Sequence, residues 1–278
     1  MGFRLLRMGL NTLLGLKKQG FFIPYRYADT LPIAEKRDVY PALLAHMKKL
    51  DPRFQEFLNL IASYKNNFST FGSKPPPYPR WEQDWFPRLD GAAAYTMVRM
   101  EKPNQIIEVG SGHSTRFMMQ AVLDENLPTK MTAIDPAPRA DISKLPIQIH
   151  NDIVQNVDPD LFTKLQAGDI LFIDSSHIAM PGTDVDYLFL NILPTLPKGV
   201  IVHIHDIFLP HAYPASWEWR GYNEQQIVAP LIFGDFEILF SSAYAARYLT
   251  THLSDTQLDR LPLSDGAFET SLWLRKQS

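Results

Sequence analysis

The sequence contains no cysteine. It therefore has no disulfide framework, no thiolate metal ligand and no cysteine nucleophile, and any bound metal must use oxygen or imidazole ligands. An excess of charge of one sign is also missing, because 27 basic residues stand against 30 acidic ones and give a formal net charge of −3. This balance provides no field that would gather nucleic acid or anionic lipid over the whole surface, so we expect a small-molecule partner and no nucleic acid.

Long hydrophobic runs are absent as well. No apolar run approaches the roughly 20 residues that span a bilayer, and no small-residue cleavage site follows the first apolar stretch, so we expect a cytoplasmic protein. What is present is a 45% share of hydrophobic residues in a chain of 278. That is enough for one large domain with a buried core, or for a domain with an appendage.

The first residues show the period of an amphipathic helix. Phe3, Leu6, Leu10, Leu13 and Leu14 fall near one face, and arginines and lysines lie close by. Such a helix can touch a membrane surface, but packing on its own domain or on a second subunit of a homodimer is more common. We therefore do not expect membrane contact from this segment.

A second helical pattern covers residues 41–64 and is followed by the proline-rich segment SKPPPYPRW. Prolines remove backbone donors and favour an extended connection. The main boundary is therefore expected there, with a helical extension and linker over residues 1–80 and a second domain over residues 81–278.

Beyond residue 90, short buried strands alternate with helical segments. The expected strands are QIIEVG (105–110), KMTAID (130–135), PIQIH (146–150), DILFID (169–174), GVIVHIHD (199–206), FEILF (236–240) and a final run ETSLWLRK (269–276). This alternation predicts an α/β fold of the Rossmann-like, doubly wound kind, with a mostly parallel sheet and helices on both faces. Ligands bind such sheets at the carboxyl ends of the strands.

The first candidate site is the segment EVGSGHST, where a strand turns through glycines into a helix. Gly110 and Gly112 can adopt positive φ and let backbone amides approach a ligand. The segment departs from G-x-G-x-x-G because Thr115 takes the third position, so a dinucleotide pyrophosphate fits less well than a smaller anionic group. On this segment alone, a tight turn capped by Ser111 or Ser114 is an equally good interpretation.

The second candidate is Asp135, which ends the strand KMTAID. A carboxylate at this place can accept hydrogen bonds from both hydroxyls of a ribose. It lies 25 positions after Gly110 (135 − 110), close to the roughly 20 expected for one helix and one strand. The alternative is an aspartate that caps its own loop.

Two further strands end in polar residues. Asp174 follows an apolar run and leads to His177, and the strand GVIVHIHD carries His203 and His205 on one face and Asp206 on the other. We interpret His203, deeper in the strand, as a hydrogen-bonded core histidine. His205 and Asp206 lie at the functional end and can act as proton acceptor and orienting group, because imidazole titrates near neutral pH.

The same residues permit a metal site. Asp174, His177, His205 and Asp206 together offer two carboxylates and two imidazoles, which suit manganese, iron or zinc better than magnesium. A hydrogen-bonded acid–base cluster without metal is the competing interpretation, and no motif with diagnostic metal spacing is present.

In order along the chain, IIEVGSGHST, AIDPAP, DILFIDSSH, GTDVDYLFLNILPTLPKG and VIVHIHDIFLP resemble class I S-adenosylmethionine-dependent methyltransferases. The sequence is most similar to the bacterial group called methyltransferase family 24. The likeness runs from about Trp81 to Phe240. It implies a seven-stranded sheet with one antiparallel strand near the edge.

The resemblance also implies a cofactor, S-adenosylmethionine, and roles for site residues. Gly110 and Gly112 would lie against its methionine part, Glu108 would help to orient it, and Asp135 would bind the ribose. Asp152 follows the third strand and is the candidate for adenine contact. The full set of candidate cofactor contacts is Glu108, Gly110, Ser111, Gly112, Ser114, Asp135, Asp152 and Asp174.

In related sugar and catechol methyltransferases, acidic residues after the fourth and fifth strands bind magnesium. Asp174 and Asp206 are similar in position, which makes them the candidate metal ligands, although His205 stands where a carboxylate is expected. His113 also departs from the family pattern, because many members have glycine at that position.

These observations predict methyl transfer to a hydroxyl of a small molecule or sugar. The protein must place the acceptor in line with the methyl group and remove its proton, a role we assign to His177 or His205 with Asp206 as the orienting group. Three alternatives stay open: a nicotinamide-dependent oxidoreductase, a metal-dependent hydroxylase on a methyltransferase-like fold, and a non-catalytic binding protein.

Overall fold

The computed structural model describes residues 3–33, 39–138 and 140–278. They form two compact units. The first unit falls within Met1–Asp38 and Tyr213–Gly221, and the second within Val39–Ala212 and Tyr222–Ser278. The sheet and every candidate residue named above lie in the second unit, apart from the amphipathic segment at the start of the chain.

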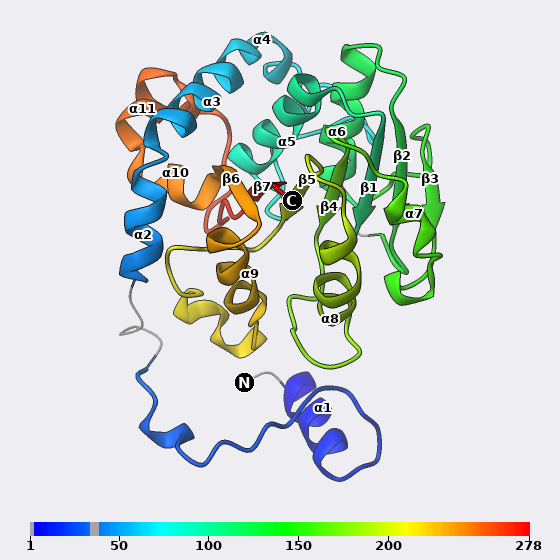
Figure 1. The fold of residues 1–278 in the computed structure, drawn as a ribbon, viewed down its shortest axis with the longest axis vertical. Coiled ribbons are helices and arrows are strands. Elements are labelled where there is room, and N and C mark those ends of the chain that lie inside the picture. Colours follow the sequence, from blue (N-terminus) through cyan, green and yellow to red (C-terminus); the bar gives the residue numbers. More distant parts are fainter. Residues whose placement is uncertain (1–2, 34–38, 139) are drawn as a thin grey trace. The chain divides into compact units, whose positions relative to one another are not determined.

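A single seven-stranded sheet organises the second unit, in the order β3-β2-β1-β4-β5-β7-β6 (Figure 1). The strands are β1 (Gln105–Val109), β2 (Lys130–Ile134), β3 (Gln148–His150), β4 (Ile170–Ile173), β5 (Ile201–Ile204), β6 (Phe236–Ser241) and β7 (Leu272–Lys276). Strands β1 to β5 pair in parallel, whereas β7 runs antiparallel to both β5 and β6. The predicted mostly parallel, doubly wound sheet with one antiparallel strand is confirmed.

The strand order fixes where a ligand can bind. From β1 the chain moves outward to β2 and β3, then returns to place β4 on the other side of β1. Helices that connect such strands diverge at this point, and the carboxyl ends of β1 and β4 therefore border a crevice. Every residue of β4 and β5 is buried, as expected for strands covered on both faces.

Helices flank the sheet. They are α2 (Pro41–Lys48), α3 (Asp51–Ser63), α4 (Lys65–Phe68), α5 (Arg88–Glu101), α6 (His113–Asp124), α7 (Asp160–Thr163), α8 (Asp184–Tyr187), α9 (Glu224–Phe233), α10 (Ser242–Tyr248) and α11 (Thr250–Asp255). Shorter helical turns are η3 (Val154–Asn156), η4 (Leu188–Ile192), η5 (Leu193–Thr195) and η7 (Leu258–Arg260). The first unit contains α1 (Phe3–Leu13), η1 (Ala28–Thr30) and η6 (Ala215–Arg220).

The expected boundary near residue 80 does not coincide with the division between the units, which falls at Asp38 and Val39. Helices α2 to α4 belong to the second unit because their apolar faces join its core. Phe54 of α3 is fully buried, and its ring lies 5.8 Å from that of Phe240 on the edge strand β6. The proline segment returns to these helices, since Trp81 donates a hydrogen bond to the carbonyl of Phe68 at 3.0 Å.

Within the described ranges, no helix combines the length and the hydropathy needed to cross a membrane.

Candidate functional site

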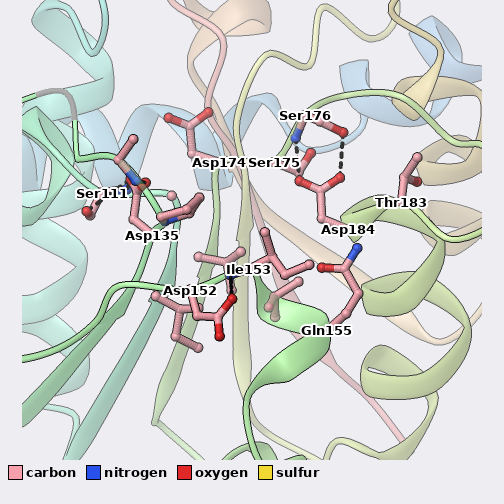
Figure 2. A pocket seen from close by; sticks show the side chains of 16 residues that line it. Ser111, Asp135, Asp152, Ile153, Gln155, Asp174, Ser175, Ser176, Thr183 and Asp184 are labelled. Atoms are coloured by element: carbon pink, nitrogen blue, oxygen red, sulfur yellow. Dashed lines mark hydrogen bonds between the residues drawn. The ribbon is translucent and has the colours of Figure 1, made fainter. Parts of the chain in front are cut away.

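A pocket of about 560 Å³ opens at the carboxyl ends of β1, β2 and β4 (Figure 2). Five of the candidate residues line it: Gly110, Ser111, Asp135, Asp152 and Asp174. The remaining polar lining, not anticipated from the sequence, comes from the segments after β3 and β4 and from the start of α8: Gln155, Ser175, Ser176, Thr183 and Asp184. Its size lies within the range of small-molecule and cofactor sites.

The turn after β1 requires glycine at its first position. Gly110 has φ +78°, and a Cβ atom there would lie 2.0 Å from the carbonyl oxygen of Asp174. The backbone of the turn is also tied to both neighbouring strands, because Gly110 N donates to Ile134 O at 3.0 Å and Asp174 N donates to Val109 O at 2.8 Å. This close approach joins the end of β1 to the end of β4 at the base of the pocket.

Glu108 stabilises the start of α6, which follows this turn. Its buried carboxylate accepts hydrogen bonds from Ser114 Oγ and Thr115 Oγ1, both at 2.5 Å. Thr115 Oγ1 in turn accepts from Gly112 N at 2.9 Å. Burial raises the pKa of Glu108 to about 8, although the two hydroxyl hydrogen bonds oppose the shift.

Three candidate cofactor contacts therefore lie outside the pocket lining. Ser114 bonds directly to Glu108, and Gly112 is linked to Glu108 through Thr115. These bonds hold the helix start in place. The sequence did contain a signal for this arrangement. A threonine at the third helical position can bond back to the backbone N–H of the capping residue, as the acidic or amide side chain of a capping box does.

Asp135 caps its own loop and also lines the pocket. Its Oδ2 accepts from Ser111 N at 2.7 Å and from Ser111 Oγ at 3.1 Å, and its Oδ1 accepts from Ala137 N at 2.7 Å. A carboxylate offers about four acceptor positions. The three donors orient Asp135 at the pocket wall and leave capacity for about one hydroxyl of a ligand, where the sequence suggested two.

Asp152 and Ile153 form the wall beyond β3. Asp152 Oδ1 accepts from Ile153 N at 2.7 Å and from Asn156 Nδ2 at 2.9 Å. These bonds fix the direction of the carboxylate at the pocket. On the side of α8, the carboxylate of Asp184 accepts from both the backbone N–H and the hydroxyl of Ser176, as the dashed lines in Figure 2 show.

An acid–base cluster lies directly behind Asp174. Asp174 Oδ1 is 3.4 Å from His177 Nε2 and 3.4 Å from His205 Nδ1. Asp206 bridges the same two rings, with Oδ2 3.3 Å from His177 Nε2 and Oδ1 3.7 Å from His205 Nδ1. The Asp174 side chain is 27% exposed, against 5% for His177 and 7% for His205. Of the four, only Asp174 lines the pocket.

Two further buried carboxylates contact the second ring nitrogen of each imidazole, the one that does not face Asp174. Neither of them was expected from the sequence as a site residue. Glu224, at the start of α9, places Oε2 2.8 Å from His177 Nδ1, while its Oε1 accepts from Ser175 Oγ at 2.9 Å. Asp90 Oδ2 lies 3.5 Å from His205 Nε2. Neither contact has a local sequence signal, because the partners are far apart along the chain.

These carboxylates set the charge of the cluster. Burial lowers the pKa of His177, but Asp174, Glu224 and Asp206 outweigh it and hold the pKa well above its usual value.

For His205, burial is likewise outweighed by Asp206, Asp174 and Asp90, so its pKa is also raised well above the usual value. Burial alone would raise the pKa of Asp174, yet the two histidines hold it well below its ordinary range.

Both imidazoles therefore carry a proton at neutral pH. An imidazolium cannot accept another proton, so the histidine base expected from the sequence is present in its conjugate-acid form. A folded-state pKa above the unfolded value means that the protonated rings stabilise the fold fully below the unfolded pKa. This contribution is lost as the pH rises through the folded pKa.

The predicted metal ligands do not fit a metal in this arrangement. Within the part of the chain that the structure describes, no group of three or more His, Asp or Glu residues is arranged to hold an ion. Asp174 Oδ1 and Asp206 Oδ2 instead lie 3.4 Å and 3.3 Å from His177 Nε2. The four residues fit the alternative of an acid–base cluster.

Two other histidines are uncharged packing residues. His203 stacks on Phe172 with ring centroids 3.7 Å apart, its Nε2 lies 2.8 Å from Ser271 Oγ, and burial holds its pKa well below the usual value. This agrees with the role predicted for it. His113, where many family members have glycine, begins α6, and burial lowers its pKa to about 4.

A doubly wound sheet with a pocket across β1, β2 and β4 is the architecture of enzymes that bind a nucleotide-containing cofactor. Residues 107–207, or 101 of 278 positions (207 − 107 + 1), match the family model described as a methyltransferase domain, that of methyltransferase family 24. The match covers less than half of the chain, and it confirms the resemblance noted in the sequence. No curated protein matches the sequence.

Solved methyltransferase structures are similar to the chain at low identity. The SAH-bound Podospora anserina methyltransferase PaMTH1 is 15% identical, with a TM-score of 0.44, over 93% of this chain and 100% of that one. The plantazolicin methyltransferase BpumL in complex with SAH is 13% identical, with a TM-score of 0.44, over 85% and 100%. Similarity at this level carries no conclusion about the activity of this chain.

Replacing Gly110 by alanine tests the contact at the base of the pocket. We expect Gly110→Ala to destabilise the second unit by more than Gly182→Ala, measured by urea denaturation. Gly182 also has positive φ (+84°), but a Cβ atom there would meet nothing within 4 Å, so its variant should show only the left-handed backbone cost of about 1–2 kcal/mol. Equal losses in the two variants would contradict the close approach of Gly110 to Asp174.

The charge of the cluster can be measured by NMR titration of the histidine rings, assigned with His177→Gln and His205→Gln variants. We expect both rings to stay protonated at pH 8, above the ordinary histidine pKa of about 6.5, whereas His113 should stay neutral down to about pH 5, because burial lowers its pKa to about 4. Titration of His177 and His205 near pH 6.5 would show that the carboxylates do not set their charge.

Proposed function

We propose that the protein transfers a methyl group from S-adenosylmethionine to a hydroxyl oxygen of a small molecule or sugar. The observation that carries this proposal is the pocket at the carboxyl ends of β1, β2 and β4, lined by Gly110, Asp135 and Asp174. All three lie inside the segment that matches the methyltransferase-domain family.

The lining residues fit the parts of this cofactor. Gly110 and Ser111 line the pocket where the methionine part would lie, and the free acceptor capacity of Asp135 suits a ribose hydroxyl. Asp152 offers an acceptor for an amino group, beside the apolar side chain of Ile153 for a flat adenine ring. When bound, S-adenosylmethionine supplies an electrophilic methyl group on a positively charged sulfonium.

Asp174 supplies a matching negative charge at the pocket. The two histidines hold the pKa of its carboxyl group well below the ordinary range, which favours the ionised form. A fixed negative charge with restricted access to water favours a cationic ligand. The protein's other task is to hold the acceptor oxygen in line with the methyl group.

Removal of the acceptor proton depends on the protonation state of His177 and His205. Neither ring lines the pocket, so the acceptor proton would reach the cluster through Asp174, which contacts both rings. The cluster can accept that proton once His205 or His177 has lost its own. Asp206 contacts both rings and orients them. The fraction of this form increases with pH, so the transfer rate should increase above neutral pH.

The alternatives are less well supported by the described residues. A dinucleotide pyrophosphate would need free amides at the glycine turn, but Gly112 N is already bonded to Thr115 Oγ1. A metal-dependent hydroxylase would need a ligand set that the cluster does not provide. A non-catalytic protein would need the same pocket without the acid–base cluster behind it.

Two substitutions separate binding from turnover. Asp135→Ala should weaken S-adenosylmethionine binding by roughly tenfold to a hundredfold, because it removes a charged hydrogen-bond acceptor worth about 1.5–3 kcal/mol. His205→Gln should leave binding nearly unchanged and reduce methyl transfer. Binding is measured by calorimetry, and transfer by S-adenosylhomocysteine release with a panel of hydroxylated acceptors.

Asp184→Asn serves as the matched control for Asp135→Ala, because Asp184 lines the pocket but is engaged by Ser176. It should change affinity less than Asp135→Ala does. Unchanged affinity in a folded Asp135→Ala protein would remove the ribose assignment, and unchanged turnover in His205→Gln would remove the histidine from the proton path.

A further inference from the structure

The apolar face of α1 is largely exposed. Phe3, Leu6, Leu10, Leu13 and Leu14 are each between 49% and 82% exposed, and no residue of α1 is buried. An amphipathic helix in a globular protein normally buries this face. Here the five apolar side chains are all left exposed.

The polar side of the same helix is the side that makes contacts. Asn11 Nδ2 donates to Gln19 Oε1 at 2.8 Å, and Gln19 N donates to Thr12 Oγ1 at 2.9 Å. Leu16 N also donates to Asn11 O at 2.9 Å. The returning chain thus covers the polar side of α1, which stabilises a local structure with its apolar face turned outward.

Positive charge is concentrated in the same segment of the sequence. Residues 1–28 contain five basic residues, Arg4, Arg7, Lys17, Lys18 and Arg26, and no acidic residue. The rest of the chain has 22 basic residues (27 − 5) against 30 acidic ones, a balance of −8. A strongly basic terminal segment on an otherwise acidic chain indicates a negatively charged partner.

A second group of exposed apolar residues follows the helix: Phe21, Phe22, Ile23, Tyr25 and Tyr27. Basic groups lie over two of these rings, with Lys18 Nζ 5.1 Å from the Phe21 centroid and the Arg26 guanidinium 5.6 Å from the Tyr27 centroid. Aromatic rings beside cationic groups are typical of segments at the interface of a membrane with water.

We propose that residues 3–27 bind the surface of a bilayer that contains anionic lipids. The apolar face of α1 and the following aromatic residues enter the boundary of the acyl chains, and the five basic side chains contact lipid phosphates. The 11 residues of α1 make a helix of about 16 Å, too short to cross a hydrocarbon core of about 30 Å. The segment therefore lies on the membrane and does not span it.

The charge distribution favours a lipid surface over a second copy of the chain. Sequence periodicity alone favoured packing on the same domain or in a homodimer. Pairing two copies through this face would bring together two segments with five positive charges each and no acidic residue, and like charges repel. An anionic bilayer satisfies both the apolar face and the charges. This proposal does not depend on the methyltransferase activity.

The test is flotation of the full-length protein with vesicles of phosphatidylcholine alone and of phosphatidylcholine mixed with phosphatidylglycerol. We expect binding to the mixed vesicles only. Leu6→Glu with Leu10→Glu should abolish this binding, and reversal of the charges at Arg4, Arg7, Lys17 and Lys18 should weaken it by more than about tenfold. High salt should weaken it as well.

The matched control is Leu190→Glu, which places a charge at a 70% exposed leucine of the second unit and should leave vesicle binding unchanged. Equal binding to neutral and anionic vesicles would overturn the proposal. So would vesicle binding that survives the Leu6 and Leu10 changes. A dimer in light scattering that the Leu6 and Leu10 changes dissociate, with no vesicle binding, would show that the face joins two copies.

Discussion

The close approach of the Gly110 backbone to the Asp174 carbonyl is the constraint on which the site depends. It leaves no room for a side chain at Gly110, and it holds the turn after β1 against the end of β4. The turn then presents Ser111 to Asp135, while the Asp174 side chain reaches the pocket. The proposed cofactor contacts and the acid–base cluster thus share one small region of backbone.

Electrostatics connect the pocket to the buried cluster behind it. Two imidazoles are kept protonated by carboxylates on different elements, and they keep Asp174 ionised in return. Breaking one partner of such a buried arrangement leaves an uncompensated charge, so each member supports the others. Asp174 lies between the two regions and can respond to a cationic ligand on one side and to the histidine protons on the other.

The sequence predicted the sheet and the strand ends, because buried strands and glycine turns have local signals. Those signals placed Asp135 and Asp174 at the pocket. It could not predict Glu224, whose partner His177 lies 47 positions away, nor the resulting charge of the histidines. It also misplaced the boundary, because prolines indicate an extended segment but not whether the preceding helices bury residues such as Phe54 against the sheet. The homodimer and the identity of the methyl acceptor stay predictions, because the fold of a single chain tests neither of them.

We propose that the pocket binds S-adenosylmethionine, and we expect this binding to need no metal. Calorimetric titration of the full-length protein tests it most directly, with S-adenosylmethionine and, separately, with NAD⁺, before and after chelator treatment. The account predicts a micromolar Kd for S-adenosylmethionine, about −8 kcal/mol, unchanged by the chelator, and no heat from the dinucleotide. Absence of S-adenosylmethionine binding, or binding that appears only with added metal, would contradict it.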